Sequence, residues 1–447
     1  MSAEISARLI GAGMSAVEAQ RKQLLFKSAD GALPAGNTSE ILRWFVPGRI
    51  EVLGKHTDYA GGRSILCAAE QGMCVVARVR ADSAINIFDA ADGRCLNFDF
   101  SADIDIPVQG WAIYPMTVAR RLANNFSGEK MRGADIALAS DLPRSAGMSS
   151  SSVLVIAIFV VLCEINGLEQ RPEYRSNIHS AEELAEYLGC IENGQSFGSL
   201  AGDKGVGTFG GSEDHTAILC CRPGILGQYS FCPVRAERIV PIPAECTFII
   251  ASSGVEAPKT DSARVQYNRI SRAARGVLDA WHRRSGENLP TLRAAAIRSE
   301  DFRQQITIAL ALSENPEFSP EVLMARFQQF FLESEEIIPA AGDALEQGDL
   351  HSFGVLVDQS QLAAEQSLGN QIPETIALAH SARELGAHAA SSFGAGFGGS
   401  VWALVSRSEA DKFCERWKEK YRSQFAGSNA ERSQFFTTDP GPGLLKI

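Results

Sequence analysis

PGRIEVLGKHTDYAGG, residues Pro47 to Gly62, is the stretch from which the rest of the chain is best interpreted. Within five residues it carries a lysine, a histidine, an aspartate and a tyrosine, and two glycines close it. Burying such groups in an apolar core is costly, and loops on a rigid scaffold often carry binding and catalytic residues. The stretch is a candidate site, although a polar surface turn that begins at Pro47–Gly48 is an equally good interpretation of these residues alone.

The length of 447 residues is too great for one ordinary hydrophobic core and sufficient for two. Hydrophobic residues make up 45% and charged residues 21%, the balance of a globular protein. Forty-two basic residues against 53 acidic ones give a net charge of −11, which argues against a nucleic-acid binder. An anionic ligand would therefore need local positive groups.

Cysteines and apolar runs indicate the compartment. Ten cysteines are scattered, without a C-x-x-C pair or metal-ligand spacing, and most lie in apolar runs, so reduced thiols and a cytoplasmic location are expected. The N-terminus lacks the basic and then apolar pattern of a secretory signal. The longest apolar run, Val153 to Cys163, is about half a membrane span, so no association with a membrane is expected.

Periodicity predicts a strand-rich first third and a helical second half. Helices are expected in the first 30 or so residues, over Trp111–Asn124, after Ser152, over Glu182–Ile191, and through most of 268–386. Strands are expected in ADIALASDLP (134–143), which ends in a turn, at AILCC (217–221) behind Asp214, at CTFIIASSG (246–254), and on both sides of the glycine loop 394–399. The predicted domain boundary lies near residue 235, among proline-containing segments.

Two familiar phosphate motifs are excluded. Gly54-Lys55 resembles the end of a Walker A loop, but the upstream glycine is one position off and His56 replaces the Ser/Thr. Gly394 to Gly399 matches G-x-G-x-x-G, but a strand pattern follows it where a dinucleotide fold requires a helix.

The serine-rich loop LPRSAGMSSSS, residues 142–152, is a stronger signal. It joins a predicted strand to a long apolar helix, so its serines fall in the first turn of that helix. Unpaired backbone N–H groups and the helix dipole favour an anion at that position, and the hydroxyls add donors and a possible Mg²⁺ ligand. A capped helix start needs only one serine, so four in a row favour phosphate binding.

The three motifs PGRIEVLGKHTDYAGG, LPRSAGMSSSSV and SSFGAGFGGSV, in that order, resemble those of the GHMP kinase superfamily, and the first is most similar to galactokinases. The segments WAIYPMTVARR, GGSEDHTAILCCRPG and YNRISRA also follow the galactokinase pattern. The resemblance implies a two-domain α/β (α+β) fold, with domains over 1–235 and 236–447 and the active site between them. It further implies ATP and Mg²⁺ as cofactors and phosphorylation of the anomeric C1 hydroxyl of a galactose-like sugar.

The resemblance also implies roles for individual residues. It implies that Asp214 accepts the proton of the sugar hydroxyl, and that Arg49 orients the Asp214 carboxylate and stabilises the transferring phosphoryl group. Sugar contacts are implied for His56, Asp58, Gly211 and Tyr267. Nucleotide and phosphate contacts are implied for Trp111, Gly147, Ser149, Ser150, Ser151, Ser152, Gly396 and Gly398, and Mg²⁺ contacts for Ser151 and Glu192.

Two departures from the family pattern affect the choice of sugar. Lys55 stands where galactokinases have a glutamate that contacts the C6 end of galactose. A buried ammonium group favours an anion, so the hypothesised substrate is a sugar with a C6 carboxylate, such as galacturonate. The alternative is that Lys55 extends into solvent and selects nothing. Glu51 stands where the family has an asparagine and is expected either near Arg49 or pointing outward.

Other functions on the same fold remain open at this point. The chain could be a true galactokinase, or a sugar sensor without catalysis, although relatives of that second kind tend to lose the serines or the aspartate. A kinase for a non-sugar alcohol such as mevalonate is disfavoured by His56-Thr57-Asp58-Tyr59, the sugar-type signature. The expected partner is a small-molecule sugar.

Overall fold

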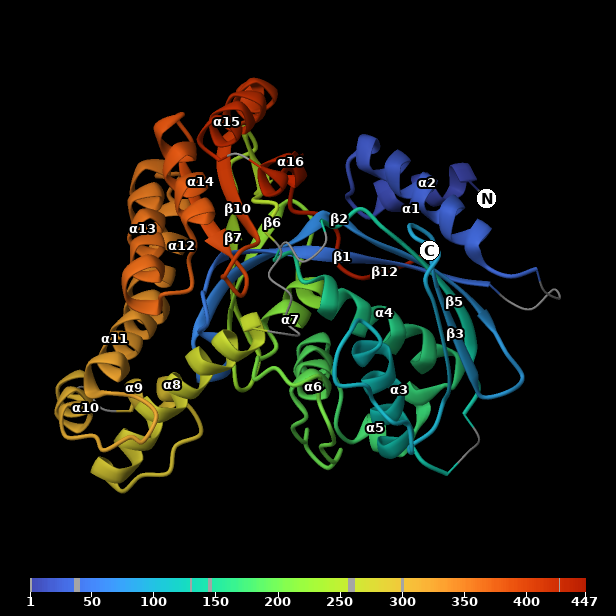
Figure 1. The fold of residues 1–447 in the computed structure, drawn as a ribbon, viewed down its shortest axis with the longest axis horizontal. Coiled ribbons are helices and arrows are strands. Elements are labelled where there is room, and N and C mark those ends of the chain that lie inside the picture. The colour runs from blue at the N-terminus through green and yellow to red at the C-terminus, as the bar shows by residue number, and fades with distance from the viewer. Residues whose placement is uncertain are drawn as a thin grey trace.

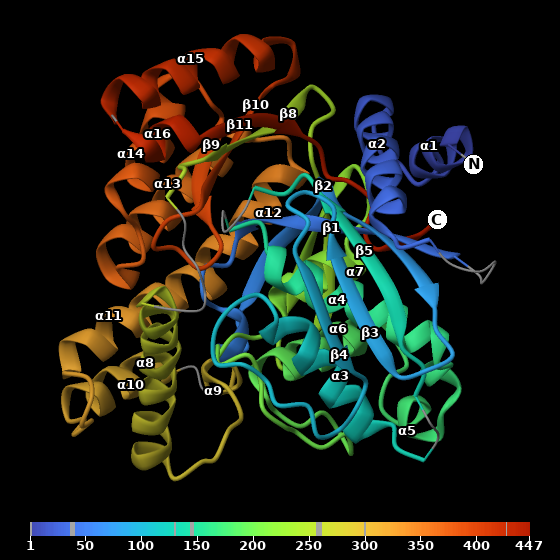
Figure 2. The same ribbon diagram turned by 45° about the vertical axis from the view of Figure 1, so that its right-hand side comes forward.

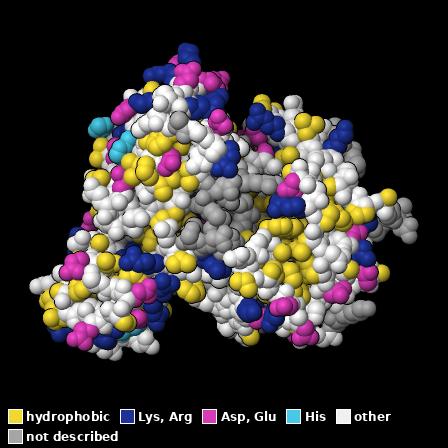
Figure 3. All heavy atoms as spheres, viewed as in Figure 1, with side chains coloured by type: hydrophobic (Ala, Val, Ile, Leu, Met, Phe, Trp, Pro, Cys, Tyr) yellow, Lys and Arg dark blue, Asp and Glu magenta, His cyan; other side chains and the backbone are white. Residues whose placement is uncertain are grey.

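Two β-sheets, each covered by helices on both faces, form the frame of the molecule (Figures 1 and 2). The computed structural model describes residues 2–35, 41–128, 131–143, 147–255, 262–298, 301–425 and 427–447. Among these, no helix has the length and apolar character needed to cross a membrane. Figure 3 shows acidic and basic side chains interspersed over the face in view.

The first sheet has the strand order β12-β1-β2-β5-β3-β4. In addition, β6 pairs with the N-terminal end of β2, and β7 pairs with β6. All of its pairings are antiparallel except β3 with β5. Its strands are β1 (Ile41–Leu53), β2 (Arg63–Val79), β3 (Ala84–Asp89), β4 (Cys95–Asp99), β5 (Ala134–Ser140), β6 (Ile225–Ser230), β7 (Arg235–Pro241) and β12 (Leu445–Lys446).

Alternating side chains of this sheet divide between two hydrophobic cores, because successive residues of a strand face opposite sides. One face packs against the N-terminal helices and the other against the helices that follow β4. The first group is α1 (Ser2–Gly11) and α2 (Ala16–Ala32). The second is α3 (Ile113–Asn125), α4 (Ser150–Ile165), α5 (Pro172–Arg175), α6 (Ala181–Asn193) and α7 (Glu213–Cys220), with the 3₁₀ turn η2 (Leu168–Gln170).

The second sheet has the order β11-β8-β10-β9 and is entirely antiparallel. Its strands are β8 (Cys246–Ser252), β9 (Ala389–Phe393), β10 (Ser400–Ser406) and β11 (Gln434–Thr438). The helices on its faces and at its edge are α12 (Ile338–Glu346), α13 (Leu350–Ala363), α14 (Pro373–Glu384), α15 (Ala410–Gln424) and α16 (Ser428–Arg432), with the π-helical segment η4 (Ala364–Leu368) and the 3₁₀ turn η5 (Arg407–Glu409).

A separate helical group projects from the second half, at the lower left of Figure 1, around its own apolar cluster. It comprises α8 (Ser262–Ser285), α9 (Leu292–Ala296), α10 (Phe302–Ala311) and α11 (Pro320–Phe331). The π-helical segment η3 (Leu332–Ile337) joins α11 to α12 and crosses back toward the first sheet.

Most of the elements expected from the sequence are confirmed, including the two leading helices, β5 and α4 around the serine loop, and β9 and β10 around the glycine loop. Two local predictions are wrong. Pro47 and Gly48 lie inside the long strand β1, where a shift in register accommodates them. The first four residues of AILCC belong to helix α7, which ends at Cys220. The boundary near residue 235 stays a prediction; β7 starts there and pairs within the first sheet. Each of the ten cysteines is a free thiol.

Candidate active site

Two cavities meet at one ion pair. The carboxylate-lined cavity, with about 520 Å³ of empty volume, and the serine-lined cavity, with about 1600 Å³, have Arg49, Asp214 and Ala395 as common wall residues. The carboxylate-lined cavity is bounded by Arg49, Glu51, His56, Asp58, Ser152, Glu192, Asn193, Thr208, Gly210, Gly211, Glu213, Asp214, His215, Tyr267, Gly394 and Ala395. A group transferred from one cavity to the other would pass Arg49 and Asp214.

Arg49 lies on β1 and Asp214 in the first turn of α7, and the guanidinium Nε donates to Asp214 Oδ1 at 2.8 Å. Burial alone would lower the pKa of Arg49, but Asp214 and its neighbouring carboxyl groups hold that pKa above its ordinary value. α7 starts with Glu213 and Asp214, and carboxylates are favourable at a helix N-terminus. The helical geometry therefore fixes Asp214 beside Arg49, where the sequence had indicated a loop followed by a strand.

Ser152 connects Asp214 to Glu192. Its hydroxyl lies 3.0 Å from Glu192 Oε2 and 3.2 Å from Asp214 Oδ2, within hydrogen-bond distance of both. His215 Nε2 lies 3.4 Å from the same oxygen of Glu192. Ser152, predicted to hold phosphate, thus lies on the wall of the carboxylate-lined cavity, and Ser151, predicted to share a metal with Glu192, lies on that of the other cavity.

The serine-lined cavity ends at the N-terminus of α4. Gly147, Ser149, Ser150 and Ser151 lie along its wall, as predicted for phosphate ligands. Ser149 takes a left-handed conformation with φ of 62°, and its buried hydroxyl has no hydrogen-bond partner among the described residues. An unpaired buried hydroxyl beside free helix N–H groups is a suitable anion ligand. Residues 144–146 of the predicted loop lie outside the described residues.

Aromatic and apolar residues also line the serine-lined cavity. Trp111 and Tyr114 line it, and the guanidinium carbon of Arg94 lies 5.6 Å from the centre of the Trp111 ring. An aromatic wall of this kind suits a planar ring such as a nucleotide base. Gly396 and Gly398, predicted for the phosphate region, also lie on the wall.

The serine loop and the glycine loop approach each other backbone to backbone behind Arg49. A side-chain carbon at Gly394 would lie 2.9 Å from the carbonyl oxygen of Gly147, so only glycine fits there without displacement. Arg49 also donates to that carbonyl oxygen. The arginine therefore holds the phosphate loop in addition to Asp214.

The loop after β1 is held by residues from the second half of the chain. Glu333 of η3 accepts a hydrogen bond from the backbone N–H of Gly54 at 2.8 Å, and Arg326 of α11 donates to the carbonyl oxygen of His56. His56 Nε2 lies 3.0 Å from the carbonyl oxygen of Ala395 and its Nδ1 3.0 Å from the Tyr59 hydroxyl. The imidazole is thereby placed on the cavity wall in a fixed orientation.

Asp58 approaches the backbone of Gly211 very closely. A side-chain carbon at Gly211 would lie 2.4 Å from Asp58 Oδ2, and the same oxygen accepts the backbone N–H of Glu213 at 3.3 Å. The ring of Tyr267, on α8, lies 5.0 Å from that of His56 between centroids. The structure thus brings the four predicted sugar contacts His56, Asp58, Gly211 and Tyr267 together on one wall.

Lys55 is placed differently from either expectation. It is only 1% exposed, so it does not extend into solvent, and it is not among the described residues that line the carboxylate-lined cavity. Its Nζ donates to Ser391 Oγ on β9 at 2.7 Å and to Ser360 Oγ on α13 at 3.1 Å. The structure therefore does not place Lys55 on the wall where the predicted contact with a sugar would occur.

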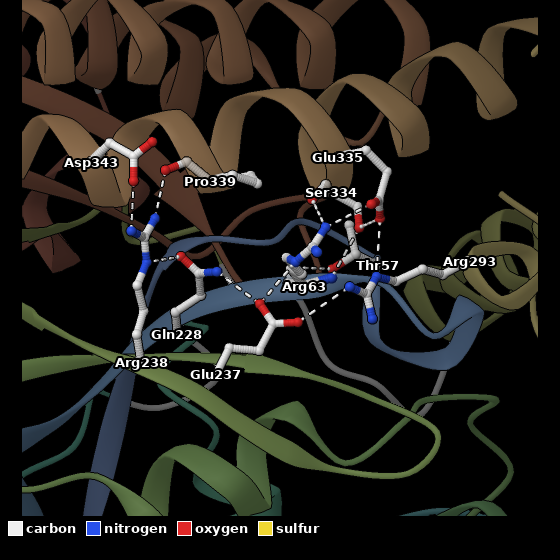
Figure 4. Close-up of polar contacts among 10 residues, drawn as sticks. All are labelled: Thr57, Arg63, Gln228, Glu237, Arg238, Arg293, Ser334, Glu335, Pro339 and Asp343. Atoms are coloured by element: carbon white, nitrogen blue, oxygen red, sulfur yellow. Dashed lines mark hydrogen bonds and ion pairs between the residues drawn. The ribbon is translucent and has the colours of Figure 1, made fainter. Parts of the chain in front are cut away.

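A polar network behind the loop joins the two halves of the chain (Figure 4). Arg63, at the start of β2, binds Glu237 at 2.8 Å and Glu335 at 2.6 Å, and Arg293 of α9 binds the same two carboxylates, each at 3.2 Å. The four side chains are between 14% and 23% exposed, so solvent screens them only in part. This arginine–glutamate ring fixes the C-terminal end of the loop.

Glu51 and Glu213 are two acidic wall residues that the motif analysis did not assign to the site. Both are buried, at 3% and 6% exposure. Burial raises the pKa of Glu51 to about 7, although the charges of Arg49 and Lys55 oppose the rise. Burial, followed by the charge of Glu51, raises the pKa of Glu213 well above its ordinary value. Strand alternation could have placed Glu51, because it faces the same side as Arg49 two residues earlier.

Family models match three parts of the chain. Residues 36–79 match the galactokinase galactose-binding signature, residues 114–201 the GHMP kinase N-terminal domain, and residues 343–423 the GHMP kinase C-terminal domain. These ranges contain the loop after β1, the serine loop and the glycine loop.

Similar proteins extend the match to most of the chain. A galactokinase of Roseiflexus sp. is 31% identical over 375 residues, which covers 82% of this chain and 84% of that protein. A galactokinase of Streptomyces coelicolor is 25% identical over 430 residues, covering 94% and 97%. The crystal structure of Lactococcus lactis galactokinase complexed with galactose covers 96% of this chain and 100% of its own with a TM-score of 0.75; at 21% identity, this likeness shows the fold alone.

Proposed function

Since the chain belongs to the galactokinase family of GHMP kinases and is an ATP-dependent sugar kinase, we propose that it phosphorylates the anomeric C1 hydroxyl of a neutral, galactose-like sugar. The observation that carries the proposal is the Arg49–Asp214 pair at the junction of the two cavities. The carboxylate-lined cavity takes the sugar, and the serine-lined cavity takes ATP.

The reaction follows from what lies at the junction. Asp214 accepts the proton of the C1 hydroxyl, whose oxygen forms the new bond to the γ-phosphorus while the bond to the bridging oxygen of ADP breaks. Arg49 orients Asp214 and offsets the negative charge on the transferring group. In phosphoryl transfer most of the catalysis comes from such positioning and charge neutralisation.

Magnesium fits the residues at the junction. Mg²⁺ is usually held by one or two carboxylates together with phosphate oxygens and water, so a small donor set suffices. Glu192 and the hydroxyl of Ser152 would hold it, since they lie 3.0 Å apart, and Ser151 remains a second candidate ligand. Within the described ranges no group of three or more His, Cys, Asp or Glu residues is arranged for a metal. The ion would neutralise phosphate charge.

The charge of the cavity wall supports a neutral sugar over a uronic acid. Five carboxyl groups, those of Glu51, Asp58, Glu192, Glu213 and Asp214, line the carboxylate-lined cavity and can accept hydrogen bonds from sugar hydroxyls. A C6 carboxylate would meet repulsion there. The galacturonate hypothesis depended on Lys55, whose ammonium group is occupied by Ser360 and Ser391.

A panel experiment tests the proposal. The protein is incubated with Mg-ATP and galactose, glucose, galactosamine or galacturonate, and ³¹P NMR identifies the product. We expect a sugar 1-phosphate from galactose at a higher kcat/KM than from galacturonate. A preference for galacturonate would overturn the neutral-sugar proposal, and turnover of no sugar would support the sensor alternative.

A further inference from the structure

Glu51 lines the carboxylate-lined cavity, hydrogen-bonds to the side chain of Glu213, and carries one buried carboxylate oxygen without an N–H or hydroxyl donor among the described residues. It lies on β1 two residues after Arg49, so both side chains leave the strand on the same face, and both line the cavity. Its Oε2 accepts the backbone N–H of Gly394 at 3.1 Å. The oxygen without such a donor is Oε1, which is buried. A buried carboxylate oxygen without a partner is costly, which suggests that a ligand supplies the missing donor.

Lys55 is buried and is not among the described residues that line either cavity. Its Nζ donates to the hydroxyls of Ser360 and Ser391. Its charge nevertheless acts on Glu51, because Lys55, together with Arg49, opposes the rise that burial causes in the pKa of Glu51. Lys55 thus favours the ionised form of the Glu51 carboxyl without contacting the cavity.

We propose that Glu51 is a sugar-binding residue that sets substrate preference, accepting through Oε1 a hydrogen bond from a hydroxyl other than the one phosphorylated. The hydroxyl that is phosphorylated would instead contact Asp214, the base at the junction of the two cavities. This inference rests on the proposed function, because it assumes that a sugar occupies the carboxylate-lined cavity.

The substitution Glu51→Gln tests the direct contact. Glutamine keeps the shape and the acceptor for Gly394 but removes the anionic oxygen from the cavity. Hydrogen bonds to a charged group contribute about 1.5–3 kcal/mol, so KM for the sugar should rise about tenfold or more at pH 8, with KM for ATP within about twofold of wild type. An unchanged KM for the sugar overturns the role of Glu51.

Glu333→Gln is the matched control. Glu333 is also a fully buried glutamate that accepts a backbone N–H, that of Gly54 at 2.8 Å, and it too has one carboxylate oxygen without a partner among the described residues. It is not among the described residues that line either cavity. A rise in KM for the sugar in Glu51→Gln that exceeds the rise in Glu333→Gln supports the proposal, and equal rises overturn it.

Failure of the two proposals can be told apart. If the wild type phosphorylates no sugar of the panel and binds none by calorimetry, both the proposed function and the role of Glu51 are overturned. If the wild type is active and Glu51→Gln retains the wild-type KM for the sugar, only the role of Glu51 is overturned.

Discussion

The carboxylate-lined and serine-lined cavities share Arg49 and Asp214 but are assembled in different ways. The serine-lined cavity takes its phosphate end from one contiguous stretch, Gly147 to Ser151 at the start of α4. The other cavity draws on β1, the loop after it, α6, α7, α8 and the glycine loop. Backbone N–H and hydroxyl donors line the phosphate end of the serine-lined cavity, whereas carboxylate acceptors line the other cavity. Donors suit phosphates and acceptors suit hydroxyl groups, so the difference in wall chemistry assigns the two substrates.

Asp214→Ala gives the largest expected effect, because it removes the group that both cavities share. Loss of a positioned general base lowers turnover by about 10²–10⁴-fold, whereas the affinity for ATP should change little because the serine wall is intact. ADP release measured with a coupled assay reports turnover, and a titration with a fluorescent ATP analogue reports binding. Asp214→Asn, which keeps the shape, should be similarly slow; near-normal turnover in either variant would contradict the assignment.

Trp111→Ala should separate the two cavities. Base–aromatic stacking contributes roughly 1–3 kcal/mol, so KM for ATP should rise about tenfold while KM for the sugar stays unchanged. Initial rates with each substrate varied in turn provide the measurement, and Trp111→Phe, which keeps an aromatic face, should lie between wild type and alanine. Equal changes in both KM values would indicate that Trp111 supports the whole site and not the nucleotide alone.

Gly211→Ala makes the complementary change on the sugar side. The added carbon would lie 2.4 Å from Asp58 Oδ2, so Asp58 must move. Forced repacking of this size costs about 1–3 kcal/mol, which should appear as a several-fold rise in KM for the sugar with little change in KM for ATP. Gly31→Ala is the control, because a side-chain carbon there meets nothing within 4 Å and alanine favours the helix. A selective rise in KM for ATP in Gly211→Ala would refute the assignment of the cavities.

The smallest expected effect is a pH dependence of stability. Glu51 has a pKa of about 7 in the folded protein and about 4.5 in the unfolded chain. Between these values the folded state binds more protons, so the free energy of unfolding falls as pH rises through this window. Glutamine does not titrate, so Glu51→Gln does not lose this stability as pH rises. The Tm of the variant minus that of the wild type should therefore be a few degrees larger at pH 8 than at pH 5. Calorimetry at both pH values tests this, and a constant difference would contradict the raised pKa.

The serine-lined cavity was the easier of the two to predict, because its phosphate end depends on local signals. Four serines between a strand and an apolar helix indicate a helix N-terminus directly, and α4 begins at Ser150, within that run of serines. The walls of the carboxylate-lined cavity come from distant segments, so only the family motif indicated them. The apolar run AILCC, of five residues, was too short a signal to distinguish the end of α7 from a strand.

The orientation of a side chain was harder to predict than its presence in the site. Lys55 was expected to face a sugar or the solvent, but Ser360 and Ser391, some three hundred residues away, hold it instead. Ser151 was predicted to lie beside Glu192, but Ser152 takes that position. Successive residues of α4 are rotated by about 100°, so Ser151 lines the serine-lined cavity and Ser152 the carboxylate-lined cavity. Sequence patterns identify such residues, whereas tertiary packing decides where they point.

The loop after β1 has a consequence for the order of folding. Its backbone is held by Arg326 and Glu333, whose contacts span about 270–280 positions of the chain. Contacts of such large sequence separation form slowly, because a long stretch of polypeptide must be ordered before they close. During refolding from denaturant, phosphate binding at the local α4 terminus should return before sugar binding. Recovery of catalysis would then report the late joining of the two halves, after most of the helical signal has returned.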